Sequence, residues 1–320
     1  MKKGIGVGGM VVWAMTLFLA GCSDPKPSLT GAELAKKYPD ASYVQLGGVS
    51  VHYKQEGLGR PLILMPGFLT HSYLWRNIVP GLTYGNTIYN LDLMGFGLSE
   101  KPQNQTYSLD TYVGQLGTFL DDFHLDNPVL VGHDASAVIA TLYALRNPGK
   151  VRKLILINAP LHPITLPLGL RLLRTRLIGD LFTGDWFLKR LLRGGVLDPA
   201  RMPDVLIKEY LAPYHDDPGA RTALLKFVRE FDLGSALESE VEPNLAKLQL
   251  PVLLLWGGQN TYVPIDLGSQ LEQDIAGSTF SVIHSTGHYI QEERPEETRA
   301  RIKEFIDKEV PAATQKSGDK

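Results

Sequence analysis

The segment Val129-Leu-Val-Gly-His-Asp-Ala-Ser-Ala137 decides the fold. It opens with a short apolar run, which is typical of a strand buried on both faces. A helical pattern over 136–146 follows directly and ends at Asn147-Pro148. Asp134 stands at the centre of this strand–turn–helix unit, where a strained turn pushes a side chain out above a sheet. Small neighbours are needed there because the turn leaves no room for larger side chains.

Outward from this unit, strand and helix patterns alternate along the chain. This alternation predicts an α/β fold with a mostly parallel sheet flanked by helices on both faces. The stretch 161–240 breaks the rhythm, because it is helical and rich in Leu and Arg. We expect it to form a cap inserted between two strands of a domain spanning 41–312, with a flexible tail at 313–320. Strands are expected at 49–55, 61–65, 86–91, 129–131, 151–157, 252–256 and 279–283, and further helices at 107–123, 265–274 and 294–308.

Composition narrows the possible functions. The 320 residues are 44% hydrophobic and 21% charged, which is typical of a globular protein and excludes collagen and coiled coils. A net charge of −2 argues against a protein that binds nucleic acid by neutralising phosphates. The single cysteine, Cys22, excludes an intramolecular disulfide and a cysteine-built zinc site. No metal-ligand set and no phosphate-binding loop is present in the pattern, so no metal or cofactor is expected.

The N-terminus has the pattern of an export signal. Two lysines precede an apolar stretch over 5–19, which ends in Leu19-Ala20-Gly21-Cys22. This tetrapeptide resembles the lipobox of bacterial lipoproteins. The resemblance implies a signal peptide over 1–21, a lipid on Cys22 that holds the protein to a membrane, and a tether over 22–40. Ser23 is similar to the residue found in lipoproteins of the outer membrane, which implies a periplasm-facing place in the cell envelope. An uncleaved anchor and a secretory signal with an incidental cysteine are the alternatives.

The turn around Asp134 resembles a known family. Together with Asp92-Leu-Met-Gly-Phe-Gly-Leu-Ser99 and Gly287-His288, it is similar to the α/β-hydrolase fold over residues 43–310. An aspartate at the turn is similar to haloalkane dehalogenases and epoxide hydrolases, and the run at 70–80 is similar to haloalkane dehalogenases in particular. The resemblance implies a cofactor-free hydrolase of small apolar electrophiles. Asp134 would form a covalent ester with the substrate, and His288 would activate the water that hydrolyses it. Ser136, two residues past the centre, is expected to pack or cap the helix.

The third member of the catalytic triad departs from the family. The two positions at which the family carries an acid hold Asn158 and Asn260 here. An amide can orient an imidazole but cannot stabilise an imidazolium as a carboxylate does. Replacing Asp by Asn in the serine-protease triad lowers the rate by about 10⁴. Alkylation of Asp134 does not need this residue, whereas hydrolysis of the ester does, so the sequence favours a protein that alkylates readily and hydrolyses slowly.

The residues around the expected pocket depart from the family in other ways. The backbone N–H groups of Phe68 and Ala135 are expected to form the oxyanion hole. Those two positions usually carry Asn and Trp in dehalogenases, which bind halide. Opening an epoxide needs a proton donor, and Tyr210 and Tyr214 in the cap are candidates, unless they only pack there. Phe227 stands where epoxide hydrolases carry a tyrosine.

Two functions of different classes remain open. The first is a dehalogenase-like or epoxide hydrolase-like enzyme, and the second is a degenerate hydrolase that binds a hydrophobic ligand or a partner at the membrane. Cationic residues in 166–193 indicate either contact with anionic lipid or ordinary amphipathic cap helices, and the second is the expectation because such faces are common. A dense group of acids is expected to be solvated on a surface helix: Glu292, Glu293, Glu296 and Glu297. Nothing in the sequence predicts the oligomeric state.

Overall fold

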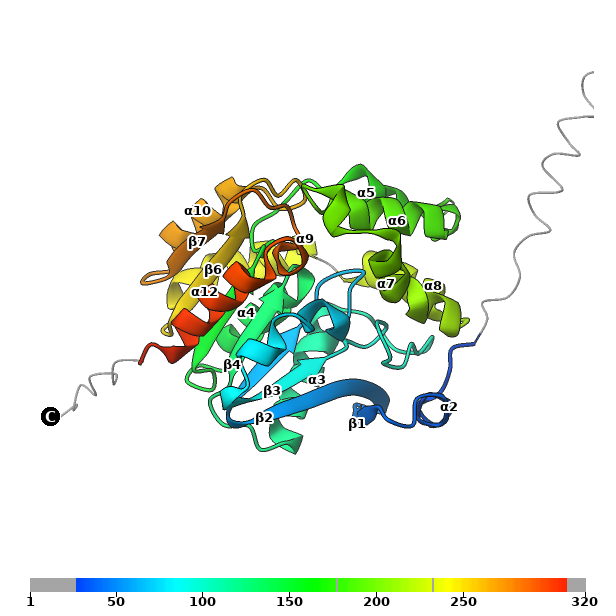
Figure 1. Ribbon diagram of the computed structural model, residues 1–320, viewed down its shortest axis with the longest axis horizontal. Helices are drawn as coiled ribbons and strands as arrows, with labels where there is room; N and C mark the ends of the chain where they lie inside the picture. Colours follow the sequence, from blue (N-terminus) through cyan, green and yellow to red (C-terminus); the bar gives the residue numbers. More distant parts are fainter. Residues whose placement is uncertain (1–26, 177, 232, 310–320) are drawn as a thin grey trace, which may run out of the picture.

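A seven-stranded sheet lies at the centre of the molecule (Figure 1). The computed structural model describes residues 27–176, 178–231 and 233–309. The strand order is β1-β2-β4-β5-β6-β7, and β3 pairs with β2. The strands from β4 onward are parallel, which confirms the predicted sheet: β4 (Val129–His133), β5 (Lys153–Ile157), β6 (Val252–Gly257) and β7 (Thr279–Ile283).

The start of the sheet differs from the prediction, because two expected strands are one. β2 runs without a break over Val49–Met65 and pairs antiparallel with β1 (Ser42–Leu46). It bends sharply through Gly57 and Gly59, which have φ of 80° and 142°. A Cβ at Gly59 would lie 2.2 Å from a backbone oxygen of β3 (Tyr84–Leu91), so only glycine fits the bend. These glycines lie between the strands expected at 49–55 and 61–65, and they bend a single strand instead of separating two.

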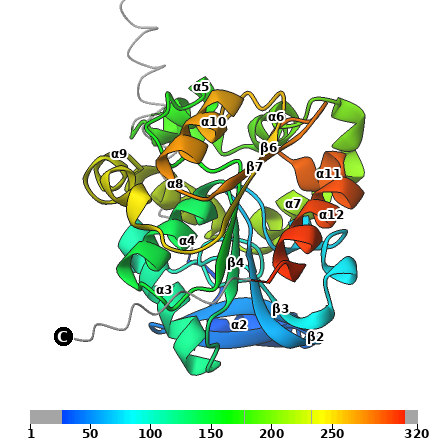
Figure 2. The same cartoon turned by 90° about the vertical axis from the view of Figure 1, so that its left-hand side faces the viewer.

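Helices cover both faces of the sheet. Figure 2 shows α3 (Leu109–Asp122), α4 (Ala135–Arg146) and α10 (Ile265–Asp274) on one face, with α11 (Ile290–Glu293) and α12 (Pro295–Asp307) on the other. The buried ammonium of Lys153 helps to end α12 by donating to the carbonyl oxygens of Phe305 and Ile306.

The cap is the helical segment between β5 and β6, and it lies over one end of the sheet in Figure 1. His162, just before the cap helices, contacts Glu242 at 2.9 Å and Asp274 at 2.7 Å. Because Glu242 follows the cap helices, these contacts join both ends of the insertion to the sheet domain. The cap helices are α5 (Leu168–Arg174), α6 (Asp185–Gly194), α7 (Asp204–Asp216), α8 (Ala220–Glu230) and α9 (Leu233–Ala236). The short helices of the described chain are η1 (Ser72–Trp75), η2 (Val79–Gly81), η3 (Gly179–Phe182), η4 (Pro199–Arg201), η5 (Leu237–Val241) and η6 (Glu242–Lys247).

The expected tether over 22–40 needs a correction in its second half. Residues 31–37 form α2 (Gly31–Lys37), which begins with a capping box between Thr30 and Glu33. Leu34 of this helix is fully buried. The expected signal peptide, Cys22 and the 313–320 tail lie outside the described residues. Within the described residues, no helix is both long and apolar enough to cross a membrane.

Asp92 joins β2, η1 and the loop that follows β3. Its fully buried carboxylate accepts hydrogen bonds from His52 Nδ1 at 2.8 Å and from the N–H groups of Ser72 and Leu98. Burial alone would raise the pKa of Asp92, but His52 and the donated hydrogen bonds hold it well below its usual range. The ionised form of Asp92 therefore stabilises the fold.

Replacing Asp92 by Ala should lower the free energy of unfolding by about 3–5 kcal/mol, because it removes one partner of a buried charged network. The difference between wild type and variant should be largest above pH 4 and shrink as the pH falls, because the depressed pKa stabilises only the ionised state. Urea unfolding at several pH values measures both effects.

Asp110 provides the control, since its exposed carboxylate pairs with Arg146 at the surface. The Asp110→Ala variant should unfold almost as the wild type does. An Asp92→Ala protein with the stability of this control would contradict the role assigned to Asp92.

Candidate active site

The turn at Asp134 has the strained geometry that the sequence predicts. Asp134 has φ 53° and ψ −122°, a conformation rare for a residue with a side chain, and it lies between β4 and α4. A Cβ on Gly132 would come within 2.6 Å of the backbone of Ala137, so the turn admits only glycine there. Strain of this kind is concentrated at functional sites.

Ser136 is part of the turn's support. Its buried hydroxyl oxygen lies 2.7 Å from the carbonyl oxygen of Met65 and 2.9 Å from that of His133, so its single O–H is shared between these two acceptors, and it accepts from the His133 N–H. These bonds use the hydroxyl fully and point it into the protein. The serine that occupies the family's second glycine position therefore joins β2 to the turn.

Backbone donors face the Asp134 carboxylate. The N–H of Phe68 donates to Asp134 Oδ2 at 3.1 Å, and the N–H of Ala135 also lowers the pKa of this carboxyl. Burial has the larger effect, so the pKa of Asp134 is raised above its usual value. The two N–H groups are arranged as in an oxyanion hole, and an oxygen of the Asp134 carboxylate lies where an oxyanion would bind.

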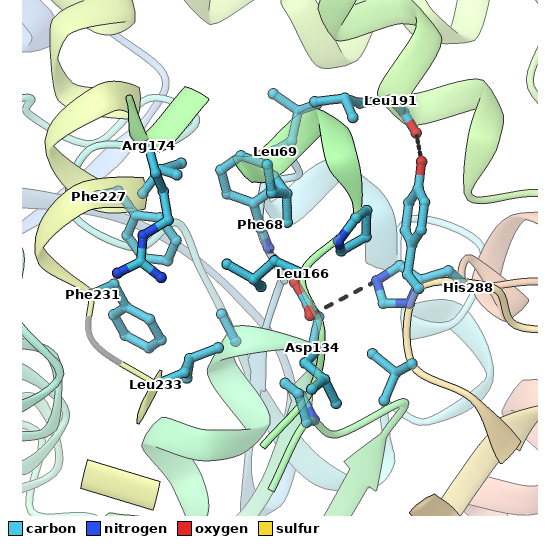
Figure 3. Close-up of a pocket in the computed structure, with 18 of the residues that line it drawn as sticks. Phe68, Leu69, Asp134, Leu166, Arg174, Leu191, Phe227, Phe231, Leu233 and His288 are labelled. Carbon is cyan, nitrogen blue, oxygen red and sulfur yellow. Dashed lines mark hydrogen bonds and ion pairs between the residues drawn. The ribbon is translucent and has the colours of Figure 1, made fainter. Parts of the chain in front are cut away.

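His288 lies beside Asp134, as Figure 3 shows. Its Nε2 is 4.0 Å from Asp134 Oδ1, and its side chain is 4% exposed. Burial lowers the pKa of His288 to about 3, so the imidazole is neutral at physiological pH. His133 is also buried and donates from Nε2 to the His288 carbonyl at 3.0 Å, so it supports the loop that carries His288.

Asn260 is the residue that contacts the His288 ring. Its Oδ1 accepts hydrogen bonds from the N–H groups of Tyr262 at 2.9 Å and Val263 at 3.2 Å. These two donors fix the orientation of the amide, so its NH₂ group lies toward His288 Nδ1 at 3.2 Å. Nδ1 must then accept, which leaves the ring proton on Nε2. A carboxylate at this position would instead accept a hydrogen bond from Nδ1–H and leave Nε2 free to act as a base.

Asn158 supports the His288 loop without touching the ring. Its Nδ2 donates to the His288 carbonyl at 2.7 Å, and its Oδ1 accepts from the Gly257 N–H at 3.0 Å. Asn158 is fully buried and has φ 48°. Of the two amide positions that the sequence left open, position 260 faces the imidazole and position 158 holds the backbone.

Two of the acids predicted to be solvated are buried instead. Glu293 accepts hydrogen bonds from the N–H groups of Gly287 at 2.6 Å and Leu197 at 2.8 Å, so it joins the His288 loop to the cap. Glu292 pairs in a bidentate manner with Arg76, at 2.6 and 2.7 Å. Local sequence patterns do not show this burial, because Leu197 and Arg76 lie far away along the chain.

The site opens into a largely apolar cavity of about 260 Å³ between the sheet domain and the cap. The rings of Phe68 and Phe227 stack at 5.8 Å, and those of Phe227 and Phe231 stack at 4.6 Å, to form an aromatic wall. Arg174, which Figure 3 shows beside these rings, is the one Lys or Arg among the described lining residues. No cluster of potential metal ligands occurs in the described chain.

The two cap tyrosines do not reach the cavity, which corrects their expected role. Neither Tyr210 nor Tyr214 lines it. The Tyr210 hydroxyl is buried and donates to Glu292, and the Tyr214 hydroxyl is buried without a partner in the described residues. Two other tyrosines line the cavity, Tyr262 and Tyr289, and the hydroxyl of Tyr262 donates to the Leu191 carbonyl at 2.6 Å. The sequence does not show which tyrosines line the cavity, because this depends on how the cap helices and the loops after β6 and β7 pack.

Comparison with known proteins agrees with this architecture. A family model described as the alpha/beta hydrolase fold matches residues 60–180. An uncharacterized hydrolase of Bacillus subtilis, YugF, is 30% identical over 268 residues, which cover 81% of this chain and 95% of that protein. The chain belongs to the α/β-hydrolase family.

Other similar proteins differ in the activities for which they are named. A cis-3-alkyl-4-alkyloxetan-2-one decarboxylase of Shewanella oneidensis is 26% identical and covers 85% of this chain and 90% of that protein. A mutant of the haloalkane dehalogenase DatA from Agrobacterium tumefaciens is 25% identical, with a TM-score of 0.75, and covers 84% of this chain and 96% of that one. The relatives thus show a hydrolase of the α/β family and leave its reaction type open.

The tautomer of His288 can be measured directly. In the wild type, ¹⁵N NMR should show a neutral ring with the proton on Nε2 from pH 5 to pH 9. In Asn260→Asp, the carboxylate should move the proton to Nδ1 and raise the pKa of His288.

Asn260→Ala is the matched control, because it removes the amide donor without supplying a charge. It should release the tautomer preference with no comparable rise in the pKa of His288. A wild-type ring protonated on Nδ1 would refute the orientation assigned to Asn260.

Proposed function

We propose that the protein reacts with small apolar electrophiles through a covalent ester on Asp134. The observation that carries this proposal is the carboxylate itself, which stands on the strained turn against the N–H groups of Phe68 and Ala135 and faces the apolar cavity. The ionised carboxylate attacks an electrophilic carbon and forms a C–O bond, while the bond to the leaving group breaks. The two N–H groups then bind the carbonyl oxygen of the ester.

The surroundings of Asp134 favour a strained-ring electrophile, such as an epoxide, over a haloalkane. Phe68 and Ala135 provide no side-chain donor for a halide. Phe227 provides no hydroxyl for the leaving oxygen of an epoxide, so this proton donor has to come from another group. When a ring opens, the leaving oxygen stays attached to the ester as an alkoxide. The Nε2–H of His288, 4.0 Å from Asp134, can donate a hydrogen bond to this oxygen, and water supplies the proton. The oxetanone named for the Shewanella relative is also a strained ring.

Hydrolysis of the ester is the slow step in this proposal. A water attacking the ester needs a base, and the hydrogen bond from Asn260 leaves the proton of His288 on the nitrogen that would have to accept one. The protein therefore acts as a covalent trap with slow turnover. We further propose that Cys22 carries the lipid that places this chemistry in the cell envelope of a bacterium.

Exposure of the protein to a panel of epoxides and haloalkanes should add one substrate mass to Asp134, as intact-protein and peptide mass spectrometry measures. Asp134→Asn should give no adduct, and Asp110→Asn, which changes an exposed carboxylate at the surface, should still give one. The rate should fall as the pH drops through the raised pKa of Asp134, because only the carboxylate attacks. The absence of any adduct in the wild type would favour a degenerate hydrolase that binds a hydrophobic ligand.

Asn260→Asp should speed hydrolysis of the Asp134 ester, so that the protein turns over as an enzyme. A carboxylate at this position restores the acceptor for Nδ1–H, and the loss of such an acceptor costs about 10⁴ in a serine-protease triad. Turnover should therefore rise by orders of magnitude, measured as product formed per protein after the first equivalent. Asn260→Ala should form the ester without this gain, and equal turnover in both variants would argue against a missing acid.

A further inference from the structure

Exposed apolar side chains gather on the cap. Of the eight large hydrophobic side chains that stand exposed in the described residues, six lie between positions 161 and 240. Three of them fall within nine residues on η3 and the first turn of α6: Ile178 is 41% exposed, Leu181 56% and Trp186 63%. We call these three residues the cap patch. An exposed apolar patch of this kind on a globular protein marks an interaction surface.

The surroundings of the cap patch are cationic. The segment 166–193 carries six Lys or Arg residues and two acids, although the whole chain has a net charge of −2. Arg171 and Arg176 are exposed, and no acidic side chain of the described residues pairs with either. An apolar patch beside unpaired cations complements an anionic surface with an apolar interior.

The N-terminal segment meets the cap beside this patch. Asp185, next to Trp186, contacts His215 at 3.0 Å and Arg221 at 2.6 Å, so the start of α6 packs against the turn between α7 and α8. The N–H of Leu29 donates to Asp217 in that same turn at 3.3 Å.

Contacts further along the N-terminal segment strengthen this junction. Lys37 donates to the Asp216 carbonyl at 2.8 Å, and the Tyr38 hydroxyl donates to the Asp216 carboxylate at 2.7 Å. Figure 1 shows α2 close to the α7–α8 end of the cap. The segment through which a lipid anchor would connect is therefore bound to the cap.

The distance to the expected anchor is short. Cys22 stands five residues before Pro27, the first described residue, so even a fully extended chain spans only about 18 Å. We propose that the cap patch rests on the anionic surface of the membrane that holds the protein. This inference relies on the proposal that Cys22 is acylated. Trp186 would then lie at the headgroup level, where tryptophan is enriched, and Arg171 and Arg176 would contact anionic headgroups.

This placement specifies the substrate class. The helices next to the cap patch also line the cavity, through Leu170 and Arg174 of α5 and Leu191 of α6. The elements that flank the cap patch therefore also form part of the cavity wall. A lipophilic electrophile that partitions into the bilayer is the substrate class that fits this placement.

A fluorescent probe can test the contact in the protein as cells process it. We would label Leu181→Cys with an environment-sensitive dye, because an acylated Cys22 leaves no other thiol in the chain. The labelled protein is extracted from membranes and reconstituted into vesicles of phosphatidylethanolamine and phosphatidylglycerol. Leu58→Cys is the matched control, since Leu58 is an apolar residue, 86% exposed, at the bend of β2.

The probe at position 181 should shift to shorter wavelength and be quenched by doxyl-labelled lipids, whereas the probe at position 58 should show neither effect. Arg171→Gln and Arg176→Gln should each lower the ratio of docked to free cap about fivefold, which corresponds to about 1 kcal/mol per cation. Asp134→Asn should dock as the wild type does, so failure of the ester chemistry and failure of docking are separate outcomes.

Three results would overturn the proposal. Equal emission from positions 181 and 58 in vesicles would show that the cap patch does not touch lipid. A shift at 181 that needs no vesicles and grows with protein concentration would assign the patch to a second copy of the chain. A processed protein without an acyl mass on Cys22 would remove the anchor on which the geometry rests.

Discussion

The site depends on one tight turn. β4 must end and α4 must begin within a single residue, and Asp134 takes a conformation that costs of order 1–3 kcal/mol to hold. The surrounding structure supplies that stability, through the close approach of Gly132 to Ala137 and the hydrogen bonds of the Ser136 hydroxyl. The parallel sheet and the packing of α4 on it keep the turn rigid. In return, the turn presents one carboxylate to a cavity built by other parts of the chain.

The protonation of His288 is decided by the backbone rather than by a charge. Two N–H groups after β6 hold the oxygen of Asn260, and the amide must then donate to the imidazole. The same backbone donors would hold one oxygen of an aspartate and leave its second oxygen to accept from Nδ1. The side chain at position 260 therefore decides the role of His288 Nε2 without changing the shape of the site. With the amide nitrogen of Asn, Nε2 carries the proton and donates; with a carboxylate oxygen, Nε2 would accept.

The parts of the molecule that follow from local pattern were predictable. The turn at Asp134, the parallel strands and the helical insertion all depend on residues close together in the sequence. Which tyrosines line the cavity was not predictable. Tyr210 lies on a cap helix and Tyr262 in the loop after β6, and the packing of that helix and that loop, not their neighbours along the chain, decides which side chain lines the cavity. The burial of Glu293 depends on Gly287 and on a cap loop almost a hundred residues away. Long-range partners of this kind leave no trace in a periodic pattern.

His162 contacts an acid from beyond the far end of the cap and another from α10. The contacts of His162 therefore hold both ends of the insertion at one place on the sheet domain. Much of the segment between these ends can change while the turn at Asp134 and the sheet keep their positions, provided that the contact between Leu197 and Glu293, which joins the cap to the His288 loop, is kept. Because both ends are held at one place, substitutions within the cap can reshape the cavity, and with it the choice of substrate, without rebuilding the sheet.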